Sequence, residues 1–283
     1  MSEIKPLTPD ERRIYVEALE REGLIISAKP VRDHETVRIP KTGSPKSVKI
    51  AVVSDTHFTS RFQQLSALRS FYKRADEWGA EAFLHGGDVD DGSHKMHRDH
   101  LFQNFVHAFD SKLEYAVAHY PKSANGKKTY FIGGNHDRSY EDDQGVSFGD
   151  HLARQRDDLV HLGMHSAFVE VGGIRAFVIH GTRGGLSYAR SYKPQKLAEQ
   201  LDPKERERTH LMLIGHYHVG LLLPRYQGMD IALLPAFQSQ TPWMRTMSLA
   251  PVIGGLLLEI TIDGGERRTK AEFVTYDPKA DDY

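Results

Sequence analysis

The sequence contains no cysteine, which excludes disulfide bonds, thiolate nucleophiles and Cys-ligated metals. No apolar run approaches the roughly 18 residues of a membrane span, and residues 1–5 lack the apolar core of a secretory signal. An excess of one charge is also missing, since Lys plus Arg total 37, Asp plus Glu total 38 and the formal net charge is -1. This balance argues against a surface that is basic throughout, although a local basic patch is compatible with it. We therefore expect a soluble cytoplasmic protein with no membrane partner.

The chain is long enough for one large domain or two small ones, with 283 residues and a mass of 32.0 kDa. Residues 1–46 are predicted to form an N-terminal α+β appendage and linker, and residues 47–283 the main domain. Thr8, Pro9 and Glu11 are typical of a helix start, and residues 24–26 and 36–39 are predicted as two short strands. A helix followed by a hairpin resembles the end of a winged-helix unit. A packing or dimerisation arm is the preferred interpretation, because the helices that normally precede a recognition helix are missing.

Strand and helix patterns alternate from residue 47 onward. Strands are predicted at residues 48–53, 82–84 and 129–132, with helices at residues 65–78 and 100–120. This alternation is typical of βαβ units and a mostly parallel sheet, and it indicates an α/β protein. The second half changes character, with hairpins predicted over residues 168–179 and 256–274, each turning at two consecutive glycines.

Polar residues follow five of the predicted strands in succession. In open α/β sheets, ligands gather just beyond the carboxyl ends of the strands. Buried polar side chains without partners each cost a few kcal/mol, so a set of this kind usually needs a metal. The residues are Asp55 and His57, then Asp88, then Asn135 and His136, then His180, and finally His216 and His218.

Carboxylate, amide and imidazole donors without sulfur suit divalent ions such as Mn²⁺, Fe²⁺ or Zn²⁺. Alternate residues of an extended segment point the same way, so Asp55 and His57 can share one ion, as can His216 and His218. These two pairs, with Asp88, Asn135 and His180, are too many ligands for one ion and about right for two that share a carboxylate. Two metals about 3.5–4 Å apart would clamp a phosphate and deprotonate a bridging water for in-line attack. We expect two divalent metal ions, with Mn²⁺ preferred over Fe²⁺, Zn²⁺ or Ni²⁺.

As an ordered set, these motifs resemble those of the calcineurin-like metallophosphoesterases over about residues 47–262. The resemblance implies a β-sandwich flanked by helices and a two-metal phosphoesterase mechanism. His136 matches the family's catalytic imidazole, which protonates the leaving-group oxygen or stabilises its developing charge, and Asp91 would orient that imidazole. By the same resemblance, the first metal would be held by Asp55, His57 and His218, the second by Asn135, His180 and His216, and Asp88 would bridge them.

One departure from the family pattern bears on the substrate. The protein Ser/Thr phosphatase branch carries an arginine where Gly92 follows Asp91, so that branch is disfavoured. The Gly-Asn-His-Asp ending is more similar to the nuclease and phosphodiesterase branches. We expect a phosphodiesterase or nuclease acting on DNA, RNA or a nucleotide. A phosphomonoesterase acting on a small molecule is the alternative, a non-catalytic binding scaffold is a lesser one, and the oligomeric state stays open.

Three further residues are candidates for binding substrate. Arg183 is a forked donor suited to phosphate, and Tyr188 could stack on a base or sugar. The alternative is an ordinary active-site loop in which Arg183 pairs with a surface carboxylate. His94 closely follows Asp91, although residues 94–100 are predicted to be a solvated loop entering a helix rather than a third metal site. His85 is expected to be packed in the core.

Overall fold

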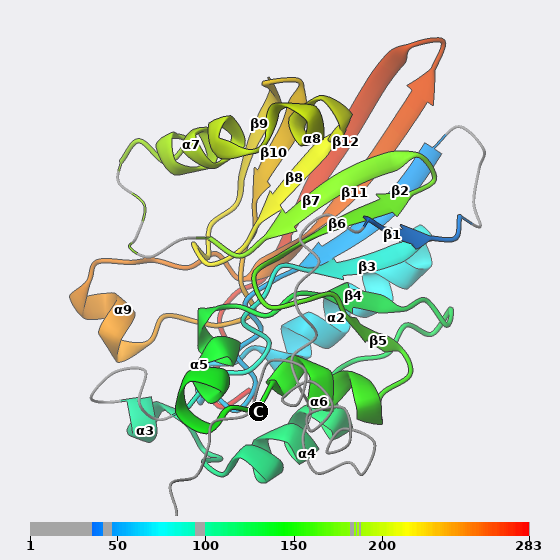
Figure 1. Ribbon diagram of the computed structural model, residues 1–283. Coiled ribbons are helices and arrows are strands. Elements are labelled where there is room, and N and C mark those ends of the chain that lie inside the picture. The colour runs from blue at the N-terminus through cyan, green and yellow to red at the C-terminus, as the bar shows by residue number, and fades with distance from the viewer. Residues whose placement is uncertain are drawn as a thin grey trace, which may run out of the picture.

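Two six-stranded sheets form the centre of the computed structural model, which describes residues 36–41, 47–93, 100–181, 184, 186 and 188–282. Across sheet A the order is β1 (Thr36–Ile39), β6 (Ser166–Val171), β7 (Ile174–Ile179), β8 (Leu211–Ile214), β10 (Met229–Leu233) and β9 (Leu221–Tyr226). Across sheet B it is β12 (Glu266–Thr275), β11 (Gly254–Asp263), β2 (Ser47–Val53), β3 (Ala82–His85), β4 (Thr129–Phe131) and β5 (Leu159–His161). The sheets form a sandwich with helices on its outside, which confirms the expected fold class (Figure 1).

Both sheets are mixed, and three of the five strand pairings in each are parallel. In sheet B, β2, β3, β4 and β5 are parallel neighbours, whereas β11 and β12 are antiparallel. In sheet A, β7, β8 and β10 are parallel, whereas β6 pairs antiparallel with β7. Both expected hairpins are confirmed, as β6/β7 and β11/β12. Gly172 and Gly173 turn the first with φ values of 55° and 84°, which most other residues disfavour.

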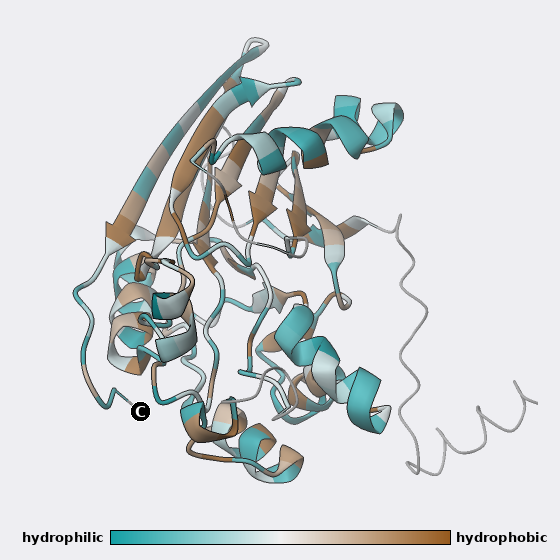
Figure 2. Ribbon diagram, turned by 90° about the vertical axis from the view of Figure 1, so that its left-hand side faces the viewer, coloured by the Kyte–Doolittle hydropathy of each residue, from teal (hydrophilic) through white to brown (hydrophobic). Residues whose placement is uncertain are grey.

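Successive apolar side chains of β2 pack into two different hydrophobic clusters. Ile50 and Val52 lie in the cluster between the sheets, together with residues of sheet A such as Val178. Ala51 and Val53 point the other way, into the cluster beneath the helices. Successive side chains of a strand face opposite sides, so one apolar strand can serve both layers. Figure 2 shows the result as largely hydrophobic strands, with more hydrophilic residues on the helices.

The helices lie on both sides of the sandwich. Apolar residues of α2, α4 and α6 pack in the core cluster beside sheet B, and Ala198 of α7 packs beside sheet A. The helix predicted over residues 65–78 is confirmed as α2, and its αL cap is Gly79. The helices are α2 (Leu65–Trp78), α3 (His100–Gln103), α4 (Phe109–His119), α5 (Asn135–Gln144), α6 (Phe148–Gln155), α7 (Tyr192–Gln200), α8 (Pro203–Arg208) and α9 (Pro242–Thr246).

The single helix predicted over residues 100–120 is wrong, because α3 ends at Gln103 and α4 begins only at Phe109. Asn104 forms a bridge with Ser60, and the Phe105 N–H donates to the Thr59 carbonyl at 3.1 Å. These contacts with the loop after β2 replace helical hydrogen bonding at residues 104 and 105, so the helix is interrupted there. Leu101 of α3 is 41% exposed.

Most of the predicted N-terminal appendage, including its helix and first strand, lies outside the described residues. Its second strand is observed as β1, which pairs in parallel with β6 at the edge of sheet A. The domain boundary at residue 46 therefore stays a prediction. Within the described residues, none of the helices has the length and apolar character needed to cross a membrane.

Candidate metal centre

The polar residues that follow the strands gather at one end of the sandwich. Parallel neighbours within each sheet end at the same edge, and the contact of His180 (after β7) with Asp88 (after β3) joins the edges of the two sheets. The residues are Asp55 and His57 after β2, Asp88 after β3, Asn135 after β4, His180 after β7, and His216 and His218 after β8.

Asp55, His57 and His218 form a first cluster. His218 Nε2 lies 3.1 Å from Asp55 Oδ1, and His57 Nε2 lies 4.0 Å from the same oxygen. The two Nε2 atoms are 3.3 Å apart. Three potential ligand atoms from buried side chains thus face a common point, as a metal site requires.

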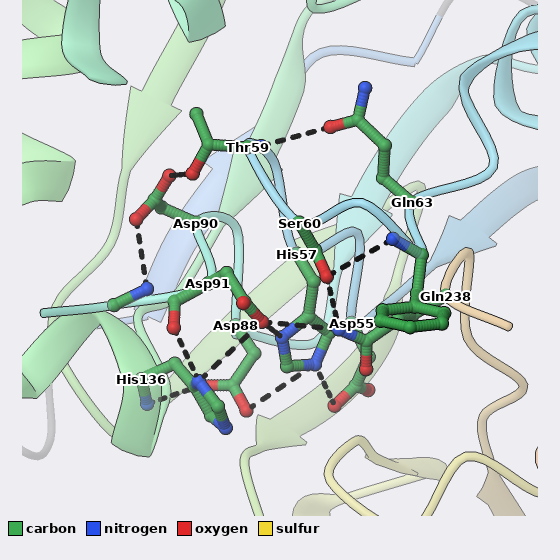
Figure 3. A network of polar contacts seen from close by, with 12 residues as sticks. Asp55, His57, Thr59, Ser60, Gln63, Asp88, Asp90, Asp91, His136 and Gln238 are labelled. Atoms are coloured by element: carbon green, nitrogen blue, oxygen red, sulfur yellow. Dashed lines mark hydrogen bonds and ion pairs between the residues drawn. The ribbon is translucent and has the colours of Figure 1, made fainter. Parts of the chain in front are cut away.

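Asp88, His180 and His216 form a second cluster, with Asn135 beside it. His180 Nε2 lies 3.0 Å from Asp88 Oδ2 and 3.2 Å from Asn135 Oδ1. The same Asp88 oxygen is 3.9 Å from His57 Nε2 in the first cluster. Asp88 therefore lies between the two clusters, where a carboxylate could serve both. Figure 3 shows Asp88 beside His57 of the first cluster.

The backbone is left-handed at many of these positions. Asp55, His57, Asp88, His216 and His218 have φ values of 51°, 44°, 54°, 80° and 55°. Positive φ is uncommon outside glycine, although Asp and His tolerate it better than most residues. Strain of this kind persists where the surroundings impose it, and it concentrates at functional sites.

The loop after β3 and the start of α5 are held together by Asp137. Its carboxylate accepts hydrogen bonds from the main-chain N–H groups of Val89, Asp90 and Gly134, each at 3.0 Å. Burial, followed by the charge of Asp88, raises the pKa of Asp137 to about 7. A Cβ on Gly134 would lie 2.1 Å from an Asp88 oxygen, so the glycine lets the two segments meet.

The centre has a strong affinity for positive charge. Burial alone would raise the pKa of Asp88, but His180 holds it well below its usual range. Burial alone would lower the pKa values of His57 and His180, yet Asp91 raises the first to about 9 and Asp88 raises the second to about 9. Divalent cations would supply the same positive charge and displace these protons, so the donor set fits metal ions.

The family model of the calcineurin-like phosphoesterases matches residues 48–232. The chain belongs to this family. The matched span includes every residue of both clusters, and the two-sheet fold agrees with it. The protein is therefore a metal-dependent phosphoric ester hydrolase.

Several solved structures are similar to this phosphoesterase in general fold. A dimetal phosphatase from Danio rerio has 11% identity and a TM-score of 0.43, covering 81% of this chain and 98% of its own. Vps29 from Entamoeba histolytica complexed with zinc has 13% identity and a TM-score of 0.41, and the match covers 80% of this chain and 99% of Vps29. The calcineurin-like phosphoesterase YfkN from Bacillus subtilis has 10% identity and a TM-score of 0.42, and the match covers 81% of this chain and 91% of YfkN. These scores are low, so none of the structures bears on the substrate. No curated protein matches the chain at a significant level.

The phosphoesterase's predicted catalytic imidazole, His136, lies against the first cluster, with its ring centroid 4.6 Å from that of His57. The Asp91 carboxylate was expected to orient it, but the Asp91 main-chain carbonyl does so, at 2.7 Å from His136 Nδ1. The nearer carboxylate oxygen is 3.9 Å away, because it accepts a hydrogen bond from His57 instead. Since a carbonyl only accepts, His136 Nδ1 donates and Nε2 is left for other partners. Burial lowers the pKa of His136 to about 4, so its ring is neutral at pH 7.

Of the predicted substrate-binding residues, His94 and Arg183 lie outside the described residues. Tyr188 is fully exposed in the segment that follows His180. Residues 94–99 of the expected solvated loop lie outside the described residues. Residue 100 begins a helix, as expected, but the His100 side chain is buried rather than solvated, with Nε2 3.0 Å from Asp91 Oδ2. His85 is packed in the core, as expected.

Three residues around Asp91 were not predicted for the site. His100, Asn104 and Gln238 are buried, and each donates a hydrogen bond to the Asp91 carboxylate. The sequence carries little signal for them, because no family motif includes them and Gln238 is far from Asp91 along the chain. The clustered histidines at residues 94–100 were the only hint.

Proposed function

We propose that this phosphoesterase hydrolyses phosphodiester bonds in a nucleic acid or nucleotide, using two divalent cations. The observation that carries the proposal is the Asp88 carboxylate, which faces His180 at 3.0 Å and His57 at 3.9 Å. When bound, such a pair of cations polarises the phosphate and activates the attacking water. The first cation would be held by Asp55, His57 and His218, the second by Asn135, His180 and His216, and both by Asp88.

The donors favour a hard or borderline cation. They are carboxylate and amide oxygens and imidazole nitrogens, and the chain has no cysteine to add sulfur. We propose Mn²⁺ as the native metal, with Fe²⁺, Zn²⁺ and Ni²⁺ as the ions to compare.

His136 is proposed to act on the leaving group through Nε2. Its Nδ1–H is held by the Asp91 carbonyl, and its own main-chain N–H donates to Asp88 Oδ1 at 2.8 Å. The ring is thus fixed relative to the carboxylate that both cations would share. A phosphate anion beside it favours the protonated ring, which can then give its Nε2 proton to the departing oxygen.

Exposed aromatic residues support a substrate with bases. Phe102 on α3 is 75% exposed, Trp243 on α9 is 44% exposed, and Tyr188 is fully exposed. Each lies on a segment that leads directly to or from residues of the metal centre. Aromatic side chains can stack on any nucleic-acid base. Tyr188, together with Arg183 and His94, is proposed to contact the substrate.

A substrate panel tests this proposal. The protein, loaded in turn with Mn²⁺, Fe²⁺, Zn²⁺ and Ni²⁺, is offered single- and double-stranded DNA, RNA, cyclic nucleotides, bis(p-nitrophenyl) phosphate and p-nitrophenyl phosphate. We expect faster turnover of diesters than of the monoester, with Mn²⁺ most active. Preference for the monoester would favour a small-molecule phosphatase, and no turnover of any substrate would favour a binding scaffold.

The variant His136→Ala tests the role of the imidazole. Loss of a general acid should lower turnover about 10²–10⁴-fold while both metals stay bound. His107→Ala, which removes an exposed histidine, is the control and should retain full activity. Loss of metal in His136→Ala would reassign the residue as a ligand.

A further inference from the structure

The Asp91 carboxylate is held by four side chains. Its Oδ1 accepts from His57 Nδ1 at 2.9 Å and from Gln238 Nε2 at 3.1 Å. Its Oδ2 accepts from His100 Nε2 and Asn104 Nδ2, both at 3.0 Å. A carboxylate offers about four lone-pair sites, so these donors occupy it fully and fix its orientation. Figure 3 shows dashed lines from the Asp91 carboxylate to His57 and to Gln238.

The hydrogen bond to Asp91 fixes the tautomer and the ring orientation of His57. Because the carboxylate only accepts, His57 Nδ1 must donate, and Nε2 is the nitrogen that faces Asp55 and Asp88. A carboxylate behind a ligating histidine commonly fixes its tautomer and ring orientation in this way. Movement of Asp91 would therefore rotate His57 within the first cluster.

Two of the supporting side chains are themselves anchored. Gln238 Nε2 also donates to Ser60 Oγ at 3.1 Å. Asn104 Oδ1 accepts from buried Lys112 Nζ at 2.7 Å and from Thr59 Oγ1 at 3.1 Å. The loop after β2 therefore fixes the position of Gln238, and the same loop together with α4 fixes the position of Asn104.

His57, Asp91 and His136 also lie close enough to one another to resemble a third metal site. The hydrogen bonds argue against it, because both Asp91 oxygens already accept from side chains and His136 Nδ1 donates to the Asp91 carbonyl. Asp91 is better described as the support of two histidines: its carboxylate holds His57 and its carbonyl holds His136.

We propose that Gln238, Asn104 and His100 are positioning residues, which fix Asp91 and thereby present His57 to the first cation independently of the second. The second cluster is held differently, since His180 Nδ1 donates to the Gly86 main-chain carbonyl at 2.8 Å. The inference rests on the proposed function only where cations and turnover are measured.

The test compares Gln238→Met with Gln240→Met. Both keep the side-chain length and remove one amide donor, but Gln240 Nε2 donates to the Leu249 carbonyl at 2.7 Å. Nitrogen-resolved NMR of the metal-free protein observes the His57 Nδ1–H directly. We expect this signal to shift or vanish in Gln238→Met and to be unchanged in Gln240→Met. An unchanged signal in both variants would overturn the proposal, whether or not the wild-type protein hydrolyses any ester.

Titration with zinc alone, followed by NMR of the histidine side chains, measures the zinc affinity of each cluster separately. In Gln238→Met we expect affinity at His57 and His218 to fall about 10–100-fold and affinity at His180 and His216 to stay unchanged. For bis(p-nitrophenyl) phosphate, kcat should fall while KM stays constant. Equal weakening at both clusters would indicate a merely structural role and would also overturn the proposal.

His100 provides a second variant if Gln238→Met is unstable. His100→Gln keeps an amide donor that can reach Asp91, whereas His100→Leu removes it. We expect His100→Gln to restore the first-cluster affinity that His100→Leu loses. Equal affinities in these two variants would contradict a role that acts through the hydrogen bond to Asp91.

Discussion

The two ligand clusters of this phosphoesterase are held by different parts of the chain. In the first, His57 donates to the Asp91 carboxylate, which side chains from distant segments keep in place. In the second, His180 donates to the main-chain carbonyl of Gly86, directly after β3. One cluster thus depends on side chains and the other on the backbone of the sheets. Substitutions should therefore be able to disturb one cluster without the other.

The largest effect is expected at Asp88, where the two clusters meet. Asp88→Asn keeps the side-chain shape but removes the charge that faces both His57 and His180. We expect both cation positions to weaken and turnover to fall by more than the roughly 10²-fold cost of losing a residue that only supports a ligand. Calorimetric zinc titration and diester turnover measure this, with Asp142→Asn on the exposed side of α5 as the control. Loss of only one cation would contradict a shared carboxylate.

A backbone change should disturb the second cluster. Gly87 has a φ of +97°, and a Cβ there would lie 2.5 Å from both the Gly133 carbonyl oxygen and His180 Nδ1. Gly79 is a matched control, because its φ is +85° and a Cβ would meet nothing within 4 Å. We expect Gly79→Ala to cost about 1–2 kcal/mol of unfolding free energy for the left-handed backbone alone, and Gly87→Ala clearly more. Urea unfolding measures both, and equal losses would contradict the close packing at Gly87.

A smaller effect is expected at His85, whose hydrogen bonds reach Thr56, beside Asp55 and His57, and Gly87, beside Asp88. Its Nδ1 accepts from the Gly87 N–H at 3.1 Å, so Nε2 is the nitrogen that donates to Thr56 Oγ1 at 3.1 Å. This arrangement needs a neutral ring, and burial lowers the pKa of His85 to about 3.

In the unfolded chain, a histidine takes up a proton near pH 6.5. Between pH 6.5 and about 3, His85 therefore binds a proton in the unfolded state but stays neutral in the folded state. The free energy of unfolding therefore falls as the pH falls. From pH 7 to pH 5, this should remove about 2 kcal/mol of unfolding free energy. His85→Gln should lose less over the same interval in urea unfolding, and the control His107→Gln should behave as the wild type. Equal losses in His85→Gln and the wild type would contradict a neutral buried ring.

The sequence predicts where the candidate ligands lie in the fold, because each follows a strand whose apolar pattern is local. Asp55 follows β2 and His216 follows β8, so the positions depend only on recognising the strands. The helix α2 is predicted for the same reason, since its apolar face repeats within its own residues.

What the sequence could not predict depends on contacts between distant residues. The break between α3 and α4 is caused by the bridge of Asn104 to Ser60, which no helical pattern reveals. The role of the Asp91 carboxylate was assigned to the wrong histidine, because only the folded chain shows which ring each oxygen reaches. Gln238 lies beyond the span matched by the family, and its link to the site, a hydrogen bond to Asp91, exists only in the folded chain.

The left-handed backbone at Asp55, His57, Asp88, His216 and His218 has a consequence for redesigning metal preference. Aspartate, asparagine, histidine and glycine tolerate such dihedral angles, whereas β-branched and bulky residues resist them. Exchanging ligand types to select a softer or larger ion would therefore meet resistance from the main chain before any question of ionic radius arises. Asn135, His180 and the residues behind them are the freer places to begin such engineering.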